Sequence, residues 1–332
     1  MLKGTFKKPK PITIYGETIL PGESKQINLY VAKLHTRTTV EIPVIVERSD
    51  KPGPVLLLIG GIHGDEVNGI EIIRRVIRKG YNKPEAGTVI CIPVFNVFGF
   101  INLSRDFPDG RDMNRLFPGS SKGSLAGRFA WLFMKEIAPV IDYALDFHTG
   151  GAQRHNHPQC RCTFDDPVTV EIAKEFGAPY LIKSALIGKS FRASLHKKGI
   201  PVVVFEGGKS LDFDEPSIVC GIKGVLNVME YLKMRKVRKK TRQKSLVIES
   251  AQWIRSPSSG LFMSRLEDAE WVKKGQLLGF VTDPYGEYEI RITSPYDGHI
   301  FCINTSTVVN KGDALFHIGL DEPSSGSGIK LD

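Results

Sequence analysis

The chain has 332 residues, of which 41% are hydrophobic and 24% charged, a composition typical of globular proteins that argues against overall disorder. Its formal net charge is +9, but residues 233–244 hold eight Lys/Arg and no acid, so the rest of the chain carries only +1. Such a local run is more often a solvated helix end or linker, so contact of this run with nucleic acid or an anionic membrane is kept only as the minority interpretation. No apolar run approaches the roughly 20 residues of a membrane-spanning helix.

The cysteine content and the chain start predict a cytoplasmic protein. Five cysteines are too few for a disulfide scaffold in a chain of this length, and their number is odd. The first ten residues are basic but no apolar segment follows them, so no secretory signal is expected.

The first 235 residues alternate between two kinds of segment. Apolar runs typical of strands covered on both faces lie at 41–47, 54–61, 88–96, 143–150, 179–182 and 201–208. Segments with helical periodicity lie at 66–80, 125–137, 167–177 and 217–236. In the first of them, Ile70, Ile73 and Ile77 share one side and Gly80 ends the helix. This order predicts an α/β domain with a mixed, largely parallel sheet flanked by helices.

The chain length predicts two domains, because it is about twice the usual single-domain size. We expect the α/β domain, with an N-terminal β extension, over residues 1–235 and a basic linker over 236–247. A small all-β domain is expected over 248–320 and a flexible tail over 321–332.

The expected β-domain contains an internal repeat. Residues 256–260 (SPSSG) correspond to 294–298 (SPYDG), and residues 272–275 (VKKG) correspond to 309–312 (VNKG). Two such halves wrapped on each other resemble a biotinyl/lipoyl-type β-sandwich. That resemblance implies a cofactor-carrying lysine between the halves, but residues 280–293 contain none. A structural or access-controlling module is therefore predicted.

Two motifs at expected strand ends carry metal-ligand chemistry. His63 and Glu66 follow the run at 54–61 within a glycine-rich turn that opens a helix, and His148 lies at the end of the run at 143–150. The carboxyl ends of strands are where sites assemble in open α/β sheets. Two histidines and a glutamate are the ligand set of a catalytic zinc site with one position left for water. The residues alone leave zinc binding and ordinary hydrogen-bonding roles about equally open.

Four motifs in order resemble one enzyme family. They are GGIHGDEVNG, GRDMNRLFPG, DFHTGG and VFEGG, within about residues 40–230. This sequence resembles the succinylglutamate desuccinylase/aspartoacylase family, which is related to the zinc carboxypeptidases. The resemblance implies that His63, Glu66 and His148 bind one zinc ion.

The resemblance also implies roles for residues around the metal. Asp112 would accept a hydrogen bond from the first ligand histidine, as ligating imidazoles generally require. Asn114 and Arg115 would bind the substrate carboxylate. Glu206 would be the general base. A further arginine would stabilise the oxyanion.

Two candidates compete for the oxyanion role. Arg105 is favoured because it precedes the turn at 107–110, and Arg111, the other candidate, is kept as a substrate-binding residue. Arg154, Arg161 and Arg192 are expected on the substrate side.

The chain departs from aspartoacylase itself, because it lacks that enzyme's tyrosine-plus-arginine spacing before the general base. Residues 190–192 (SFR) stand in that region instead. This difference puts specificity for N-acetylaspartate in doubt.

A second possible metal cluster lies at residues 155–162, where two histidines and two cysteines are close in sequence. Its spacing is tighter than that of zinc knuckles and Pro158 interrupts it. We therefore expect a loop at the edge of the active site and no second metal.

The sequence thus predicts a zinc-dependent deacylase that cleaves the amide bond of an N-acyl amino acid or a related small amide. Its partner would be a small carboxylate substrate, with neither nucleic acid nor membrane, and homo-oligomerisation is left open. The alternatives are a carboxypeptidase or ester hydrolase, which shares every site residue, and a non-catalytic binding protein, which would have lost a ligand or the base.

Overall fold

The computed structural model describes residues 10–236, 243–266 and 270–320. The strands before residue 210 are β1 (Ile12–Ile14), β2 (Glu17–Ile19), β3 (Ser24–Lys33), β4 (Thr39–Arg48), β5 (Val55–Gly60), β6 (Thr88–Ile92), β7 (Tyr143–Gly150), β8 (Arg154–Cys162), β9 (Tyr180–Lys183) and β10 (Val202–Lys209). The α-helices are α1 (Val67–Arg78), α2 (Val97–Ile101), α3 (Leu125–Glu136), α4 (Pro167–Phe176), α5 (Phe191–His196) and α6 (Glu215–Tyr231). Short 3-10 helices span Met113–Arg115 and Ala138–Val140.

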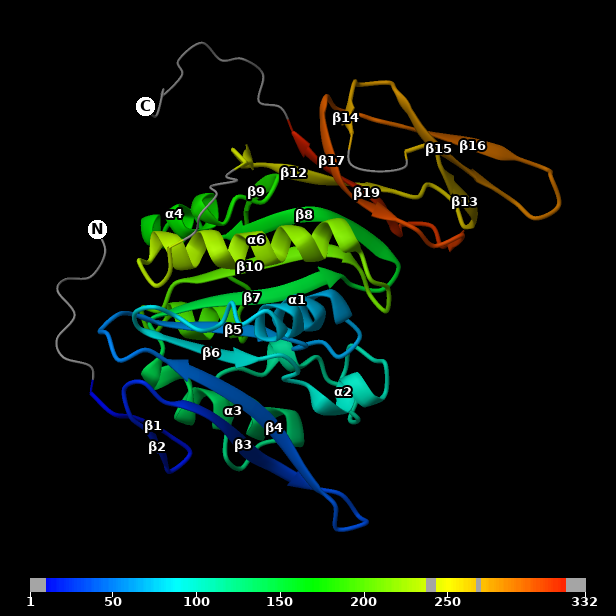
Figure 1. Cartoon of the computed structure of the whole chain (residues 1–332). Helices are drawn as coiled ribbons and strands as arrows, with labels where there is room; N and C mark the ends of the chain where they lie inside the picture. The colour runs from blue at the N-terminus through cyan, green and yellow to red at the C-terminus, as the bar shows by residue number, and fades with distance from the viewer. Residues whose placement is uncertain (1–9, 237–242, 267–269, 321–332) are drawn as a thin grey trace.

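The later part of the chain is built from short strands. They are β11 (Leu246–Ile248), β12 (Ala251–Arg255), β13 (Gly260–Ser264), β14 (Trp271–Val272), β15 (Leu277–Thr282), β16 (Glu289–Thr293), β17 (Gly298–Asn304), β18 (Val308–Val309) and β19 (Ala314–Leu320). They lie at one end of the molecule, next to β8 (Figure 1).

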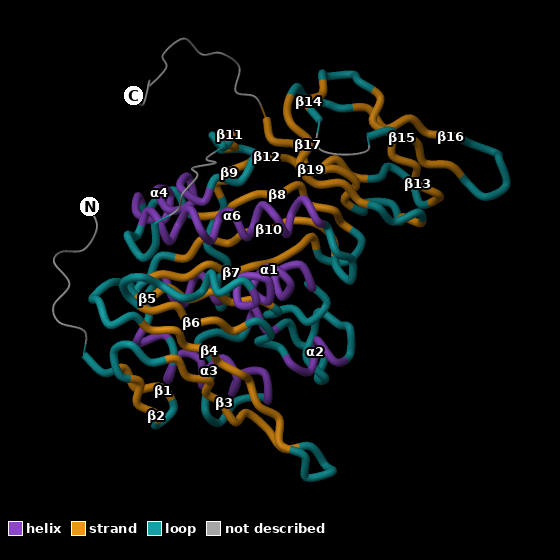
Figure 2. The backbone as a smooth tube through the Cα atoms, viewed as in Figure 1, coloured by secondary structure: helices purple, strands orange, loops and turns teal. Residues whose placement is uncertain are grey.

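The centre of the molecule is a mixed sheet. Strands β6, β5, β7 and β10 are parallel neighbours, and β4 and β8 add to the two sides of this group in antiparallel orientation. Helices cover the two faces of the sheet (Figures 1 and 2). The predicted α/β architecture with a largely parallel centre is therefore confirmed.

Each face of the sheet has its own core because side chains alternate along a strand. In β5, Leu57 and Ile59 join the core that contains residues of α3 and α5, whereas Leu56 and Leu58 join the core that contains residues of α1, α4 and α6. All four side chains are fully buried. Burial of one such side chain contributes roughly 2 kcal/mol to the free energy of folding.

Helix α1 buries a different stripe from the predicted one. Ile70 and Ile77 are only partly buried, and the buried apolar residues are Ile72, Ile73 and Val76. The reason is tertiary: α6 packs so closely on α1 that a Cβ atom on Gly221 would lie 2.4 Å from Cδ1 of Ile72.

Ion pairs on α1 predict a pH-dependent stability. Glu71 accepts hydrogen bonds from Nε of Arg74 and of Arg75, both at 2.6 Å, and Arg75 also reaches Glu215 at the start of α6. The hydrogen bond from Arg74 is the largest cause that lowers the pKa of Glu71 to about 2. Because the carboxyl pKa is near 4.3 in an unfolded chain, this stabilisation is complete above that pH and is lost as the pH falls towards 2.

We therefore expect the free energy of unfolding of the Glu71→Gln variant at pH 7 to be about 1–2 kcal/mol lower than that of the wild type. The difference should fall to roughly half at pH 3, which lies between the folded and unfolded pKa values. Urea denaturation of both proteins at the two pH values measures it. A difference of equal size at both pH values would show that the Glu71 charge does not stabilise the fold.

The C-terminal part has the predicted two-fold internal repeat. Strand β13 of the first half pairs with β18 of the second, and β14 of the first half pairs with β17 of the second. The equivalent Ser256 and Ser294 hydroxyls each donate a 2.6 Å hydrogen bond to the carbonyl two residues later. The halves are therefore wrapped on each other, whereas the likeness to biotinyl/lipoyl domains stays a prediction.

The α/β part and the C-terminal part share one sheet. Strand β17 pairs with β8, with Cys302 opposite Asn156, and β11 pairs with β9. Strand β11 begins inside the expected linker at 236–247, of which residues 237–242 lie outside the described ones, as does the expected tail at 321–332. The two domain boundaries stay predictions.

The described residues include no helix that is both long and apolar enough to cross a bilayer. All five cysteines are free thiols, four of them buried. From the basic run at 233–244, Arg235 donates hydrogen bonds to the carbonyls of Gly80 and Tyr81. The cytoplasmic location stays a prediction.

Candidate active site

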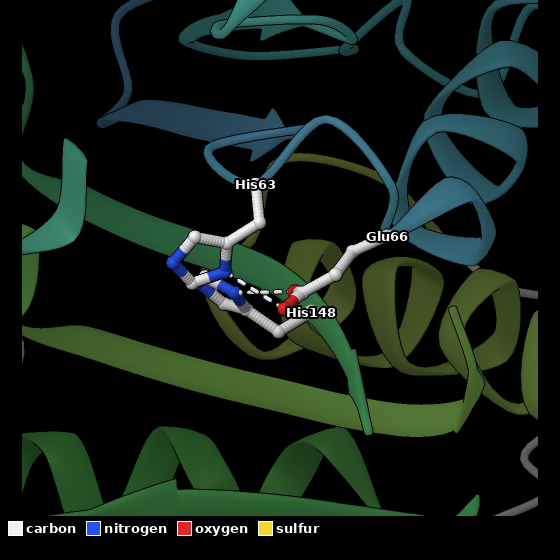
Figure 3. Close-up of side chains that lie close together, drawn as sticks. All are labelled: His63, Glu66 and His148. Carbon is white, nitrogen blue, oxygen red and sulfur yellow. Dashed lines mark hydrogen bonds and ion pairs between the residues drawn. The ribbon is translucent and has the colours of Figure 1, made fainter. Parts of the chain in front are cut away.

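Three buried side chains from two distant parts of the chain meet at one edge of the sheet (Figure 3). Nδ1 of His63 lies 2.7 Å from Oε1 of Glu66, and Nδ1 of His148 lies 2.8 Å from Oε2 of the same carboxylate. One ligand atom from each residue lies within 4.8 Å of the others. The arrangement brings two imidazoles and one carboxylate around a single point.

The sheet topology explains why they meet. His63 lies in the turn after β5, Glu66 immediately precedes α1, and His148 is in β7. Strands β5 and β7 are adjacent and parallel, with Gly60 opposite Phe147, so their carboxyl ends share one edge. A positive φ of 60° at Gly61 turns the chain sharply out of β5.

The second nitrogen of each histidine also has a carboxylate partner. Nε2 of His63 lies 3.2 Å from Oδ1 of Asp112, and Nε2 of His148 lies 2.9 Å from Oδ2 of Asp146. Such partners fix the tautomer and the ring orientation of metal-ligating histidines. Asp146 was not among the predicted site residues, although its position two residues before His148 in a strand puts both side chains on one face.

The electrostatics of the cluster favour positive charge. Burial acts against ionisation of His148, but Asp146 and Glu66 outweigh it and hold the pKa of His148 well above its usual value. Burial also opposes ionisation of Glu66, yet His63 and His148 hold its pKa well below its usual range. The cluster therefore stabilises a cation beside the Glu66 carboxylate.

These donors fit a zinc ion. Both imidazoles direct Nδ1 to the same carboxylate while Nε2 is held by another acid, so the two Nδ1 atoms and Glu66 remain as the ligand face. Two histidines and one glutamate are the donor set of catalytic zinc sites.

The structure separates the two arginines that compete for the oxyanion role. Nη1 of Arg105 lies 3.1 Å from both Nδ1 of His63 and Oε1 of Glu66, and Nη2 donates to Asp112 at 2.9 Å. Arg111 is exposed and lies 3.5 Å from Asp109, so the structure does not bring it to the cluster. Of the two arginines, only Arg105 lies beside His63 and Glu66.

Glu206 lies on the strand next to the one that carries His148. In the parallel pairing of β10 with β7, Glu206 is opposite His148, so the two side chains lie on the same face. Oε2 of Glu206 accepts a 2.6 Å hydrogen bond from Nδ2 of Asn156, and Oε1 lies 3.5 Å from Nε of Arg161. Asn156 was not predicted, because its segment was expected to be a loop.

A cavity of about 440 Å³ opens beside the cluster. All predicted site residues line it except Arg111 and Asp112. Asn114 accepts a 2.8 Å hydrogen bond from the backbone N–H of Phe191, which ties the 3-10 turn at 113–115 to the start of α5. Trp253 and Cys302 from the C-terminal part also line the cavity, so this part of the chain contributes to the site.

The segment at 155–162 is strand β8 instead of the expected loop. Cys160 and Cys162 are buried in the core that contains residues of α1, α4 and α6. His155 lies 2.8 Å from Asp214. Among the residues that the structure describes, the group able to hold a metal is His63, Glu66 and His148, and the expectation of no second metal stays a prediction.

Comparisons with known proteins agree with this geometry. Residues 52–232 match the family model of the succinylglutamate desuccinylase/aspartoacylase catalytic domain. An N-alpha-acetyl-L-2,4-diaminobutyric acid deacetylase from Halomonas elongata is 27% identical over 290 residues, which are 83% of this chain and 84% of that protein.

Solved structures share the fold over most of the chain. A succinylglutamate desuccinylase/aspartoacylase from Rhodobacter sphaeroides has a TM-score of 0.80 at 25% identity, covering 90% of this chain and 95% of its own. The product-bound ectoine utilization protein EutE (DoeB) from Ruegeria pomeroyi has a TM-score of 0.80 at 23% identity, covering 95% of this chain and 100% of its own. Because the family model spans more than half of the 332 residues, the chain belongs to the succinylglutamate desuccinylase/aspartoacylase family.

Proposed function

We propose that this protein is a zinc-dependent hydrolase that cleaves the amide bond of N-acyl amino acids. The observation that carries the proposal is the buried cluster of His63, Glu66 and His148 with Glu206 opposite His148 on the next strand. The Halomonas elongata relative is named as a deacetylase of an N-acetyl amino acid, which makes compounds of this class the first substrates to test.

The zinc ion and Glu206 have different roles in the proposed reaction. A zinc ion held by His63, Glu66 and His148 supplies Lewis acidity towards the amide carbonyl and towards water. Glu206 takes the proton of the attacking water and returns it to the leaving amine. Asn156 orients the Glu206 carboxylate through the 2.6 Å hydrogen bond to Oε2, which leaves Oε1 for the proton.

Arginine side chains stabilise charge on the substrate. Arg105 reaches the metal-ligand cluster and donates to the oxygen on which negative charge develops. Asn114 and Arg115 bind the carboxylate of the amino acid, for which a planar guanidinium is suited. The hydrogen bond from the backbone N–H of Phe191 to Oδ1 of Asn114 holds this pair in place.

Metal removal and restoration test the proposal. We expect dialysis against a chelator to abolish hydrolysis of N-acyl amino acids and one equivalent of zinc per chain to restore it. Plasma mass spectrometry reports the zinc content and amine release reports turnover. Hydrolysis that persists in metal-free protein would contradict the proposal, as would zinc binding without hydrolysis of any N-acyl amino acid, which would favour a binding protein.

A further inference from the structure

Strand β10 has a bulge directly after the proposed general base. It pairs with β7 as far as Glu206 opposite His148, and pairing resumes with Lys209 opposite Gly150, so three steps along β10 match two along β7. The register against β8 also shifts after Glu206. Bulges beside active sites re-aim a neighbouring side chain. The direction of the Glu206 carboxylate therefore depends on how the bulge is held.

Asn68 holds the bulge from the first turn of α1, two residues after the proposed metal ligand Glu66. Its side chain is fully buried, and Nδ2 donates to the carbonyls of Gly207 at 3.5 Å and of Lys209 at 3.4 Å. Oδ1 accepts a 2.9 Å hydrogen bond from the backbone N–H of Asp214. The donor and the acceptor of the amide thus both bind the segment that follows the general base.

The bulge lies directly against the Asn68 amide. Gly208 has a φ of 76°, and a Cβ atom there would lie 2.6 Å from Nδ2 of Asn68 and 2.7 Å from Cβ of Asp214. The glycine allows both the positive φ and the close approach of the backbone. Because the contact is this close, a shift of the Asn68 side chain moves the bulge as well.

The same segment also contacts the other elements that carry metal ligands. The backbone N–H and Oγ of Ser210 donate to the carbonyl of Gly150, at the end of β7, at 3.2 and 3.1 Å. The backbone N–H of Leu211 donates to the carbonyl of Asp65, in the turn after β5, at 2.9 Å. Of these links to the ligand-bearing elements, the one from Asn68 reaches the bulge itself.

Strand β8 holds the Glu206 carboxylate from the other side. Asn156 donates to Oε2 of Glu206, and Nε2 of the preceding residue, His155, lies 2.8 Å from Oδ2 of Asp214. The hydrogen bond with His155 is the largest cause that lowers the pKa of Asp214 to about 2. Asp214 thus joins β8 to the amide of Asn68, and the two strands and α1 form one hydrogen-bonded unit around the general base.

We infer that Asn68 is a positioning residue, which fixes the Glu206 carboxylate relative to the metal ligands by holding the bulge of β10. The inference rests on the proposed function, because Glu206 has to act as the base. Asn68 does not line the cavity, so it acts through the backbone and not by contact with the substrate. A displacement of about 1 Å can lower a rate about 100-fold even when its cause lies far from the reacting atoms.

The Asn68→Asp variant tests this inference. It keeps the acceptor for the N–H of Asp214 but replaces the donor by an oxygen that repels the two carbonyls. An acid in the first turn of a helix is otherwise favourable, so the fold should be retained. We expect kcat to fall about 10- to 100-fold, with KM within about 2-fold of the wild type and unchanged zinc content. If this variant does not fold, Asn68→Ser removes the same donor without adding charge.

The matched control is Asn227→Asp. Asn227 is also a buried helical residue, and its Nδ2 donates to the carbonyl of Phe176 at 3.2 Å, but it lies outside the active-site cavity. Its kcat and KM on the N-acyl amino acid that the wild type hydrolyses fastest should match those of the wild type. An equal loss of kcat in both variants would overturn the inference, because the loss of any buried amide would then suffice.

A double-mutant cycle tests whether Asn68 acts through Glu206. In the Glu206→Gln protein no carboxylate is left to position, so adding Asn68→Asp should change the remaining kcat by less than about 2-fold. If Asn68→Asp lowers kcat by the same factor with and without Glu206→Gln, the inference is wrong while the proposed function stands.

Proton release on binding of a small zinc ligand reports the position of Glu206 without turnover. Acetohydroxamic acid binds zinc as its anion, so its proton passes either to a nearby base or to the buffer. Calorimetry of zinc-loaded protein in two buffers of different ionisation enthalpy counts the released protons. We expect Asn68→Asp and Glu206→Gln to release about one proton per site more than the wild type and Asn227→Asp.

The possible outcomes separate the two claims. The expected pattern supports the inference even if no N-acyl amino acid is hydrolysed, a result that would count against the proposed function alone. Proton release that changes in Glu206→Gln but not in Asn68→Asp would overturn the inference alone. Equal proton release by all four proteins would overturn both, because Glu206 would then not be a base beside the metal ligands.

Discussion

Replacement of Glu206 by Gln should leave zinc bound and reduce kcat by about 10³. Glutamine keeps the shape of the side chain and its contact with Asn156, but it has no carboxylate to take a proton from water. Glu206 is not among the metal ligands, so the ligand set of His63, Glu66 and His148 stays complete. Zinc content by mass spectrometry and amine release under saturating substrate measure the two effects separately.

The matched control for this prediction is Glu289→Gln, because Glu289 is exposed on β16 and lies outside the cavity. It should show wild-type zinc content and turnover. A Glu206→Gln protein that turns over at the wild-type rate would remove Glu206 from the mechanism. Loss of zinc in that variant would show instead that the residue supports the metal.

The Gly64→Ala variant should be destabilised by about 3 kcal/mol and should bind zinc poorly. Gly64 lies between His63 and Glu66, and a Cβ atom there would lie 1.9 Å from the carbonyl carbon of Gly99 and 2.1 Å from the backbone nitrogen of Phe100. Backbone atoms at that distance cannot move aside as a flexible side chain does. The turn that carries two of the three ligands would have to shift away from α2.

Gly188→Ala is the control for this effect. Gly188 does not require a positive φ, and a Cβ atom there would have nothing within 4 Å. Thermal unfolding and zinc content should therefore match the wild type in Gly188→Ala and fall in Gly64→Ala. A Gly64→Ala protein with unchanged melting temperature and zinc content would show that the turn tolerates a side chain.

The C-terminal part of the chain gives the site one of its walls. Trp253 and Cys302 line the cavity, and Trp253 contacts Arg154 at the start of β8. The sequence predicted a structural or access-controlling module there. The structure adds a direct contribution of side chains to the cavity.

Local sequence patterns are enough to predict the central strands and the grouping of His63, Glu66 and His148. Continuous apolar runs at 54–61 and 201–208 predict strands buried on both faces, and β5 and β10 lie there. Because parallel strands end at a common edge, His63 and His148 were expected at the same place, and both contact Glu66. These inferences need only neighbours in sequence and the geometry of a strand.

Which other side chains reach the cavity depends on the three-dimensional fold. Arg105 and Arg111 lie in one loop, and the path of that loop brings only Arg105 to the cluster. Strand β8 is not predicted from the sequence, because its polar residues and its proline are typical of a loop. In the structure this strand places Asn156 against Glu206. Trp253, which lines the cavity, lies in β12, far along the chain from the cavity residues of the α/β part. Contacts of this kind depend on how sequence-distant strands such as β8 and β17 pair, which local residue preferences do not specify.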